Sequence, residues 1–517
     1  MSRILGIDLG TTNSAMAVVN DYGRAEIIPN REGGRITPSV VLIDGSTSLV
    51  GEGAKAEALL RPYDTVSLVK RHMGERDWSF RSESGKSFSA EEISALILLK
   101  LKEDAEHQLG ETIDEAVISV PAYFDDAGRS ATMHAGQIAG LTVNRILNEP
   151  TAAAMAYGTD NPEASTYLVY DLGGGTFDVT IMRISGNDFE VLASAGDRNL
   201  GGFDWDNALM EWVDKEFSSQ GGPSLVSDPD PGISQMLRDN VVRAKHTLTT
   251  RDEAKILLSA HGFRANIPVS RAQFADLTSS LLNRTARLVD IALESANLGW
   301  SEIGTVLLAG GSTRMTQVTD LITNVAGRRP SIDVNPDEVV ALGAAVQGAL
   351  EMAKQGTLPV PLVDRSGNRI NEPRVSDITN HSLGVEVLTQ GPFGQTGLEN
   401  SILIHKGTRI PAIGTDDFAT VSDYQTAWEC VVNEGEGTEL RFVNPIGTGR
   451  ITLPGTYRAN SPMRITLAYD VNAIVHVTVQ DLVSGNVIGE LHLQRNDNLD
   501  PSEIASRAAD IGQMEVL

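Results

Sequence analysis

Cysteine is almost absent from this sequence, which contains a single one, Cys430, among 517 residues. One thiol cannot form an intrachain disulfide, which excludes the disulfide-stabilised secreted domains and favours a reducing compartment. We therefore expect Cys430 to be a buried apolar thiol. The nine histidines are scattered without metal-ligand spacing, and none pairs with Cys430 in a catalytic motif. Transition-metal and cysteine-protease chemistry are thus disfavoured.

Long apolar runs and an excess of basic residues are also missing. No segment has the unbroken apolar length of a membrane-spanning helix, and the N-terminus enters a strand-like pattern without a secretory signal. The 42 lysines and arginines are outnumbered by 68 aspartates and glutamates, which gives a formal net charge of −26. Such a charge disfavours nucleic acids and anionic membranes as partners. We expect a cytoplasmic protein.

One local pattern occurs twice in a chain long enough for two or more domains. A strand-like run, Arg3–Gly10, leads through a tight polar turn into a second apolar run, Ser14–Val19. The same design returns at Tyr167–Met182, which predicts two related lobes. Further strands such as Ala116–Val120 alternate with helical patterns such as Asp125–Ala139, which favours an α/β fold.

The character of the sequence changes after Gln355. Prolines, glycines and mixed charges without any period follow, which is typical of a linker over residues 356–376. Short alternating runs separated by turn residues then predict an all-β sandwich over residues 377–495. For residues 496–517 we expect one short helix at most. Residues 1–355 would form the α/β domain.

The two repeated turns carry the chemistry of phosphate binding near a metal ion. That chemistry needs glycine turns for backbone donors, hydroxyls as further donors, and carboxylates for hydrated Mg²⁺. Each turn supplies an aspartate at the end of a strand, followed by small and hydroxyl residues. These residues are Asp8, Gly10, Thr11, Thr12 and Asn13 in the first turn, and Asp171, Gly173, Gly174, Gly175 and Thr176 in the second. Two such turns facing each other predict a clamp on a polyphosphate.

Both turns resemble the phosphate loops of the DnaK-type 70-kDa heat-shock chaperones. The resemblance covers roughly residues 1 to 350 through an ordered series of motifs. They are Val69–Arg71, Val120–Phe124, Asn148–Ala153, Leu200–Gly202 with Asp204, Gly310–Arg314 and Asn335–Glu338. It implies an actin-like (ribonuclease H-like) two-lobed ATPase domain that binds ATP or ADP with Mg²⁺.

The resemblance also implies roles for individual residues near the phosphates. Asp8 and Asp171 would orient water around Mg²⁺, while Thr11, Thr12 and Thr176 would touch the β- and γ-phosphates. Lys70 would neutralise charge developing on the γ-phosphate. Glu149 and Asp178 would position or deprotonate the attacking water, and which of the two takes the proton stays open.

On the nucleoside side, the resemblance places further residues around the cofactor. They are Gly201, Gly202, Lys245, His246, Thr249, Gly310, Gly311, Ser312 and Arg314. Two positions depart from the family pattern: Val242 stands where a glutamate commonly contacts the ribose, and His246 replaces a stacking arginine. Losing a charge-assisted hydrogen bond costs roughly 1.5 to 3 kcal/mol, so we expect weaker nucleotide binding.

Communication between the domains is altered. Pro121 and Arg129 match family positions that relay nucleotide state to the substrate domain. The family's linker is a short run of leucines and valines, whereas this chain has the more polar Arg374–Asp377. We expect apolar docking area to be lost, which puts coupling in question.

The β-sandwich resembles the family's peptide-binding domain more weakly. Leu388 and Trp428 would lie at the peptide site, where Trp428 is either simple core packing or part of a remodelled pocket. After Asn498–Glu503, where the family begins a helical lid, only a short segment follows, so we expect no lid.

Two functions remain open. The first is a chaperone-like ATPase that binds polypeptide clients and works with a J-domain co-chaperone and a nucleotide-exchange factor. The second is a dedicated ATP-binding partner of one client enzyme, with general peptide binding lost. A small-metabolite kinase on the same fold is disfavoured by the sandwich and the chaperone-type motifs.

Overall fold

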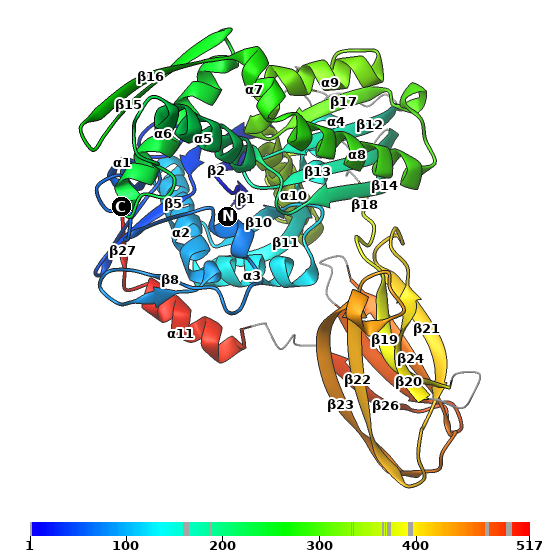
Figure 1. The fold of residues 1–517 in the computed structure, drawn as a ribbon. Helices are drawn as coiled ribbons and strands as arrows, with labels where there is room; N and C mark the ends of the chain where they lie inside the picture. The colour runs from blue at the N-terminus through cyan, green and yellow to red at the C-terminus, as the bar shows by residue number, and fades with distance from the viewer. Residues whose placement is uncertain are drawn as a thin grey trace.

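The computed structural model describes residues 3–158, 165–185, 188–331, 333, 335–363, 367, 369, 374–390, 396–470, 475–492 and 499–517. Two α/β lobes form the larger body, from which an all-β sandwich projects (Figure 1). We call residues 3–158 with helix α10 lobe I, residues 165–331 lobe II, and residues 377–492 the sandwich. Within the described ranges, no helix is both long and apolar enough to cross a membrane.

Lobe I is built on a mixed sheet of order β11-β10-β1-β2-β3, with β4 paired to β2. Its strands are β1 (Ile4–Asp8), β2 (Asn13–Val19), β3 (Ala25–Ile27), β4 (Thr37–Pro38), β10 (Glu115–Val120) and β11 (Thr142–Asn148). A smaller sheet contains β5 (Val40–Asp44), β6 (Thr47–Val50) and β7 (Thr65–Ser67), and β8 (Phe80–Arg81) pairs with β9 (Ser87–Phe88). The helices are α1 (Glu52–Glu57), η1 (Val69–His72), α2 (Ala90–Leu109), α3 (Asp126–Ile138) and α4 (Glu149–Gly158).

Helix α2 begins where its sequence signals a start. The Ser89 side chain accepts from the backbone N–H of Glu92, while the Glu92 carboxylate accepts from the N–H of Ser89. This reciprocal capping satisfies two backbone donors that a helix N-terminus otherwise leaves open. The helix then buries Ile93, Leu96 and Ile97 completely in the lobe I core.

Lobe II repeats the strand, turn, strand design on a sheet of order β17-β12-β13-β14-β18. The strands are β12 (Ser165–Leu172), β13 (Phe177–Ser185), β14 (Asp188–Asp197), β15 (Glu253–Ala260), β16 (Phe263–Ser270) and β17 (Thr305–Ala309). The helices are α5 (Gly202–Ser219), α6 (Pro231–Leu248), α7 (Arg271–Leu277), α8 (Ser279–Ala296), η2 (Trp300–Glu302), η3 (Gly311–Arg314) and α9 (Thr316–Ala326). Strands β15 and β16 form a separate two-stranded sheet.

Helix α10 (Val339–Gln355) packs on α4 and on the sheet of lobe I at very short range. A Cβ atom on Gly343 would lie 1.8 Å from the carbonyl oxygen of Ala152, and one on Gly6 would lie 2.1 Å from the backbone nitrogen of Ala345. Glycine is therefore required at both crossings, because any side chain would push the elements apart. These close crossings fix the position of α10 against α4 and against β1.

The sandwich consists of two four-stranded sheets, β20-β19-β22-β23 and β21-β24-β25-β26. Its elements are β19 (Leu383–Gln390), β20 (Thr396–Ile404), β21 (Ala412–Ala419), β22 (Gln425–Glu434), η4 (Leu440–Phe442), β23 (Asn444–Tyr457), β24 (Pro462–Tyr469), β25 (Val475–Asp481) and β26 (Val487–His492). Cys430 is buried in its core, as expected, and burial raises the pKa of the thiol to about 12.

The polar run Arg374–Asp377 docks on lobe II in spite of its composition. Residues Arg374–Ser376 form strand β18, which pairs in parallel with the first residues of β14. The expectation of lost docking counted only apolar side chains, whereas this contact is made by the backbone, whose hydrogen bonds do not depend on side-chain type. Val375 and Ile378 add apolar contacts with the core between the lobes.

The chain returns to lobe I after the sandwich. Residues 499–517, which we call the return segment, contain α11 (Pro501–Ile511) and the short strand β27 (Glu515–Val516). The strand joins the small sheet of lobe I beside β6, at the opposite side of the lobe from the sandwich (Figure 1). The sequence pattern predicts the helix, but it does not predict this strand.

Candidate active site

The two glycine turns of the lobes lie directly against each other. A Cβ atom on Gly174 would lie 2.4 Å from the Thr12 side chain, and one on Gly175 would lie 2.5 Å from the Thr11 side chain. The second turn therefore approaches the first as closely as it does only because it has no side chains. Residues about 160 positions apart thus form one site, as the duplicated pattern predicts.

The first turn is braced by two serines. Ser14 accepts from the backbone N–H of Gly10 at 3.3 Å, and the Ser39 hydroxyl donates to the carbonyl of Gly10 at 2.7 Å. The N–H of Ser39 also donates to the carbonyl of Thr12 at 2.9 Å. Sequence reasoning gave no role to Ser39, because its distance along the chain from the turn hides the contact.

The second turn is held by two other glycine motifs. The N–H of Gly202 and the hydroxyl of Ser312 both donate to the carbonyl of Gly173, at 3.0 and 2.8 Å. A Cβ atom on Gly201 would lie 2.5 Å from the backbone nitrogen of Gly175. Gly310, at φ +79°, packs in the same way against Leu172. Motifs from two other parts of lobe II thus meet around this turn.

Four carboxylates gather behind the turns. The pKa of Asp8 and that of Asp178 are each raised to about 7, first by burial and then by the charge of Glu149. Burial also raises the pKa of Asp171, with Glu149 and Asp178 as the next causes. Like charges this close disfavour simultaneous ionisation, so the cluster would be stabilised by a bound cation.

One lysine faces this acidic cluster. Lys70 is 4% exposed, and its ammonium group pairs with the carboxylate of Glu149. Asp178 accepts a hydrogen bond of 2.9 Å from the backbone N–H of Tyr123, and Asp8 accepts one of 3.1 Å from Ser119. The side chains of Lys70, Glu149, Asp8 and Asp178 are therefore held in place by the protein itself.

Arg71 joins the two lobes beside this cluster, a role the sequence did not assign to it. Its guanidinium donates to the carbonyl of Gly175 at 2.8 and 3.2 Å and to the carboxylate of Asp204 at 2.6 Å. Asp204 also accepts from the N–H of Gly201 at 2.8 Å, so one arginine ties lobe I to the second glycine turn and to the start of α5. Both residues stand in the quoted motifs, but only the fold shows that they pair.

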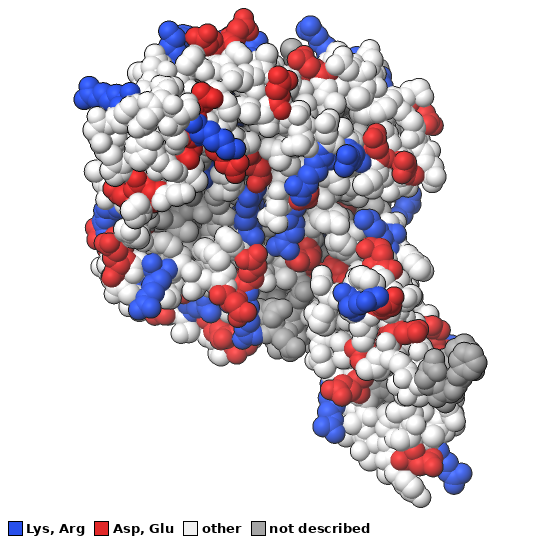
Figure 2. Space-filling model, viewed as in Figure 1, with Lys and Arg blue, Asp and Glu red and all other residues white. Residues whose placement is uncertain are grey.

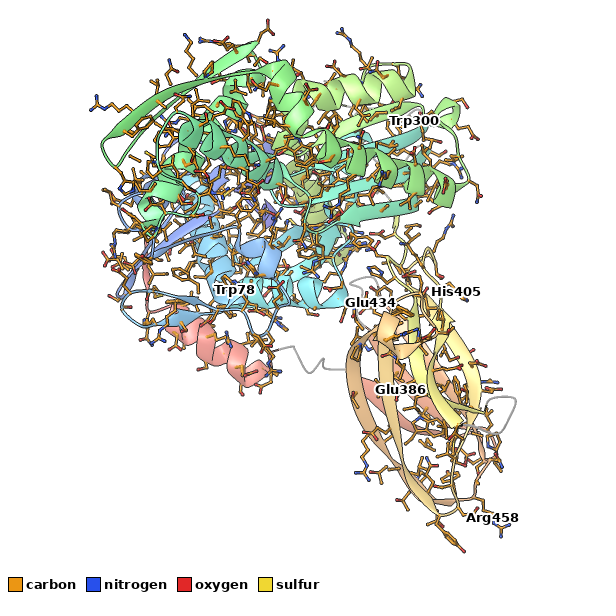
Figure 3. All side chains as sticks on the ribbon, viewed as in Figure 1. Trp78, Trp300, Glu386, His405, Glu434 and Arg458 are labelled. Atoms are coloured by element: carbon orange, nitrogen blue, oxygen red, sulfur yellow. The ribbon has the colours of Figure 1, made fainter. Side chains whose placement is uncertain are left out.

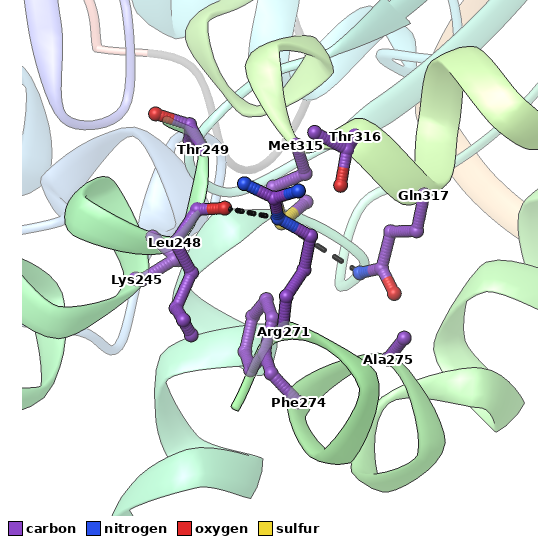
Figure 4. A pocket seen from close by; sticks show the side chains of 9 residues that line it. All are labelled: Lys245, Leu248, Thr249, Arg271, Phe274, Ala275, Met315, Thr316 and Gln317. Atoms are coloured by element: carbon purple, nitrogen blue, oxygen red, sulfur yellow. Dashed lines mark hydrogen bonds between the residues drawn. The ribbon is translucent and has the colours of Figure 1, made fainter. Parts of the chain in front are cut away.

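A pocket lies on the predicted nucleoside side (Figure 4). Lys245 of α6, Thr249, which follows α6, and Met315, which follows η3, line the pocket. Arg271 donates to the carbonyl of Leu248 across it at 2.8 Å. Lys245 is buried and pairs with Asp206 at 2.8 Å. The remaining lining residues are Phe274, Ala275, Thr316 and Gln317.

The other predicted nucleoside residues lie around this pocket without lining it. Arg314 donates to Asp337 at 2.6 and 3.0 Å and to Asn335 at 2.7 Å. A Cβ atom on Gly311 would lie 2.7 Å from the same Asp337 carboxylate. His246 is exposed. Asp337 is therefore a residue that sequence reasoning missed, although it stands in the quoted Asn335–Glu338 motif.

Comparison with known families agrees with this geometry. The family model described as "Hsp70 protein" matches residues 4–515, nearly the whole chain. The chain belongs to the Hsp70 family. Its α/β fold class, with actin-like lobes followed by a β-sandwich, is thereby confirmed, as is the resemblance to the DnaK-type chaperones.

Membership also fixes the general function. Hsp70 proteins are ATP-binding chaperones and ATPases that use Mg²⁺ and bind client proteins, with J-domain and nucleotide-exchange partners. This protein therefore has the general ATP-binding, chaperone-type function of the family.

Figure 2 shows basic side chains among the acidic ones on the viewed face, so the acidic excess does not gather there into one patch.

The predicted relay residues of this Hsp70 protein lie where the lobes meet the sandwich. Arg129 is buried and donates to the side-chain oxygen of Asn148, whose amide nitrogen donates to Asp377 at 2.6 Å. Asp377 follows strand β18. Pro121 is also buried, and its carbonyl accepts from the N–H of Phe124. A continuous chain of hydrogen bonds therefore connects α3 with the end of the linker.

Further contacts fix the near end of the sandwich. The rings of Tyr123 and His381 meet edge to face with centroids 4.9 Å apart, and Lys406 lies over the Tyr123 ring. Arg409 pairs with Glu190 of β14. In Figure 3, His405 and Glu434 lie at the end of the sandwich that faces the lobes and Arg458 at the far end, so the sandwich stands end-on to the two lobes.

The predicted peptide-site residues occupy different environments. Leu388 of β19 is 49% exposed and lies opposite Leu398 of β20, which is 53% exposed. Trp428 of β22 is half-buried, packs against the sandwich core and lies opposite Ile451. The packing of Trp428 favours the core-packing interpretation over an open pocket.

Proposed function

We propose that this Hsp70 protein binds ATP or ADP with Mg²⁺ between its lobes, hydrolyses ATP, and engages a polypeptide client through the sandwich. The observation that carries the proposal is the contact of Gly174 and Gly175 with the side chains of Thr12 and Thr11. Facing glycine turns present backbone donors and hydroxyls to one small volume, which suits a polyphosphate.

The carboxylates support a magnesium site. Asp8 and Asp171 would hold the hydrated ion, and their pKa values, raised by burial and by neighbouring acids, mark a site where a divalent cation offsets repulsion. Among the described residues, no three His, Cys, Asp or Glu side chains are placed to hold an ion directly, and the proposed contact runs through water. When bound, Mg²⁺ neutralises phosphate charge.

The remaining chemistry belongs to the chain's own side chains. Lys70, already fixed beside Glu149, would neutralise charge on the γ-phosphate without reorganising. Thr11, Thr12 and Thr176 would hold phosphate oxygens. Asp178, held by the N–H of Tyr123, or Glu149 would orient or deprotonate the attacking water, and the choice between them stays open.

On the nucleoside side, Lys245, His246 and Thr249 would hold adenosine opposite Gly311, Ser312 and Arg314 of η3. Thr249 lines the pocket, and Asp337 fixes the Arg314 guanidinium. Val242 of α6 cannot accept hydrogen bonds from the ribose, and His246 is a weaker stacking partner than arginine. We therefore propose that nucleotide is bound less tightly than a glutamate at position 242 would allow.

A second function is favoured by the sandwich itself. Trp428 packs on the core instead of opening a pocket, which supports a dedicated ATP-binding partner of one client enzyme without general peptide binding. The same β18 and Asp377 contacts would then transmit nucleotide state to an interaction surface.

Single-turnover ATP hydrolysis on the full chain, with and without a panel of extended apolar peptides, tests both functions. Stimulation by peptide is the result expected of a chaperone that binds many clients. Hydrolysis that ignores every peptide favours the dedicated partner. Failure to hydrolyse ATP, or hydrolysis undiminished in Lys70→Ala, would overturn the assignment of the cleft chemistry.

A further inference from the structure

The return segment completes the core of lobe I. Ile511, Met514 and Val516 are 1%, 8% and 6% exposed, and they belong to the same apolar cluster as Leu96 and Ile97 of α2. Leu499 and Ile504 pack against that cluster from partly buried positions. Side chains this deeply buried are part of a folding unit, because releasing them would expose a contiguous apolar surface.

The backbone of the segment is part of the small sheet of lobe I. Strand β27 pairs in parallel with β6, with Glu515 opposite Thr47 and Val516 opposite Ser48. The N–H groups of Glu515 and Leu517 donate to the carbonyls of Ser46 and Ser48 at 3.0 and 2.9 Å, and Leu517 accepts from Val50 at 3.0 Å. The strand thereby covers an edge of the sheet that would otherwise present unpaired backbone groups.

An ion pair joins the segment to the start of α2. Arg507 donates to the Ser89 hydroxyl at 2.7 Å and to the Glu92 carboxylate at 2.9 Å. These are the two side chains that cap α2. The arginine thus binds the same polar groups that start the central helix of the lobe.

The other end of the sandwich is held by lobe II, where strand β18 pairs with β14 and Arg409 pairs with Glu190. Asp377 also accepts a hydrogen bond from Asn148 of lobe I. The chain therefore leaves lobe II, forms the sandwich, and ends its described course inside lobe I. A movement of one lobe relative to the other acts on both attachments of the sandwich.

We propose that the return segment is a permanent second anchor, which stays on lobe I in every nucleotide state and holds the sandwich between the two lobes. The sandwich then cannot swing free on its linker alone, so nucleotide state changes its orientation and not its attachment. The nucleotide dependence rests on the proposed function, whereas the attachment itself does not. A segment that releases reversibly would leave the lobe I core open in one state.

A disulfide lock provides the first test. Thr47→Cys with Glu515→Cys places thiols on paired residues of β6 and β27 in the full chain, whose only native cysteine is buried. Single-cysteine variants are the matched controls. We expect the oxidised double variant to bind nucleotide and to respond to peptide as its reduced form does. Loss of turnover or of that response on oxidation, with recovery on reduction, would show that release is part of the cycle.

Hydrogen exchange on the wild-type full chain provides the second test and needs no ATPase activity. In apo, ADP and ATP samples, we expect the amides of Glu515 and Leu517 to exchange at least about 100-fold more slowly than in an unfolded chain. Fast exchange without nucleotide would overturn the anchor itself. Protection without nucleotide that disappears with ATP would overturn only its permanence.

Two variants separate anchoring from folding. Val516→Asp places a charge in the lobe I core, and we expect faster exchange in β6 as well as in β27. Arg507→Ala keeps the core and removes only the ion pair, and we expect local loss of protection around α11 with nucleotide binding retained. If β6 exchange stays unchanged in Val516→Asp, the return segment is not part of lobe I and the proposal fails.

Discussion

Asn148 donates a hydrogen bond to Asp377 at 2.6 Å, which joins the last residue of β11 in lobe I to the residue that follows the linker strand β18. Arg129 holds the other end of the Asn148 side chain. Asp377 is 9% exposed, and burial raises the pKa of its carboxyl, so this acid depends on its partners for compensation.

Asp377→Ala should uncouple the sandwich from the cleft. The substitution leaves the Asn148 amide without its acceptor and removes the negative charge near Arg129, at a cost of about 1–3 kcal/mol in the docked arrangement. We expect basal single-turnover hydrolysis to be retained and its response to peptide or client to be lost. Asp416→Ala, an exposed acid on the sandwich, is the control. An unchanged response in Asp377→Ala would contradict a role for this chain of bonds.

Lys70→Ala should slow hydrolysis by about two orders of magnitude or more, because a fixed cation beside the γ-phosphate is lost. Binding of ATP should persist, since the glycine turns remain. Single-turnover hydrolysis together with nucleotide titration separates the two effects. Lys354→Ala, which changes an exposed lysine on α10, should leave the rate unchanged.

The acidic cluster predicts a pH dependence of stability. Because the folded pKa of Asp8 and of Asp178 is raised to about 7, the folded state binds more protons than the unfolded state between about pH 4 and pH 7. The free energy of unfolding should therefore fall as pH rises through this window in nucleotide-free protein. Asp178→Asn should stabilise the protein at pH 7.5 by on the order of 1–3 kcal/mol.

That gain should shrink toward pH 5, where Asp178 of the wild type is protonated and no longer repels Glu149. Denaturant unfolding at both pH values measures it. The same cluster predicts that Mg²⁺ with nucleotide displaces protons, which calorimetry in buffers of different ionisation enthalpy detects. Equal stabilisation by Asp178→Asn at pH 5 and pH 7.5 would show that electrostatic repulsion is not its cause.

Val242→Glu should strengthen nucleotide binding by roughly tenfold, because it supplies an acceptor for the ribose hydroxyls. Val242 is half-buried on α6, one turn before Lys245 and His246. Titration with a fluorescent ATP analogue gives the dissociation constant. Ser234→Glu adds the same charge near the start of the helix and should leave affinity unchanged. Tight binding that Val242→Glu does not improve would refute the prediction.

Trp428→Val should destabilise the sandwich by about 2–4 kcal/mol, because it removes a large side chain packed against the core. Denaturant unfolding, followed through a probe in the sandwich, measures the loss. Peptide binding should not improve. A variant of unchanged stability that gains affinity for extended peptides would show instead that Trp428 fills a functional pocket.

Much of the cleft could be predicted from contiguous residues. An aspartate at the end of a buried strand, followed by glycines and threonines, is a phosphate-binding motif that can be recognised within ten residues of sequence. Its repetition at Asp8 and Asp171 predicted two facing loops. The ordered family motifs that contain Lys70 and Glu149 predicted further residues of the site. Residue type at a strand end is local information, so a sequence contains it directly.

What only the tertiary structure decided are pairings between distant residues and those made by the backbone. Arg71 and Asp204 lie 133 positions apart, and either could have been a solvated charge. The pairing of β18 with β14, and of β27 with β6, cannot be recognised from side-chain types, because hydrogen bonds between peptide groups form with almost any residue. The sequence by itself therefore determined which residue types meet between the lobes, while the fold decided how the sandwich is attached to them.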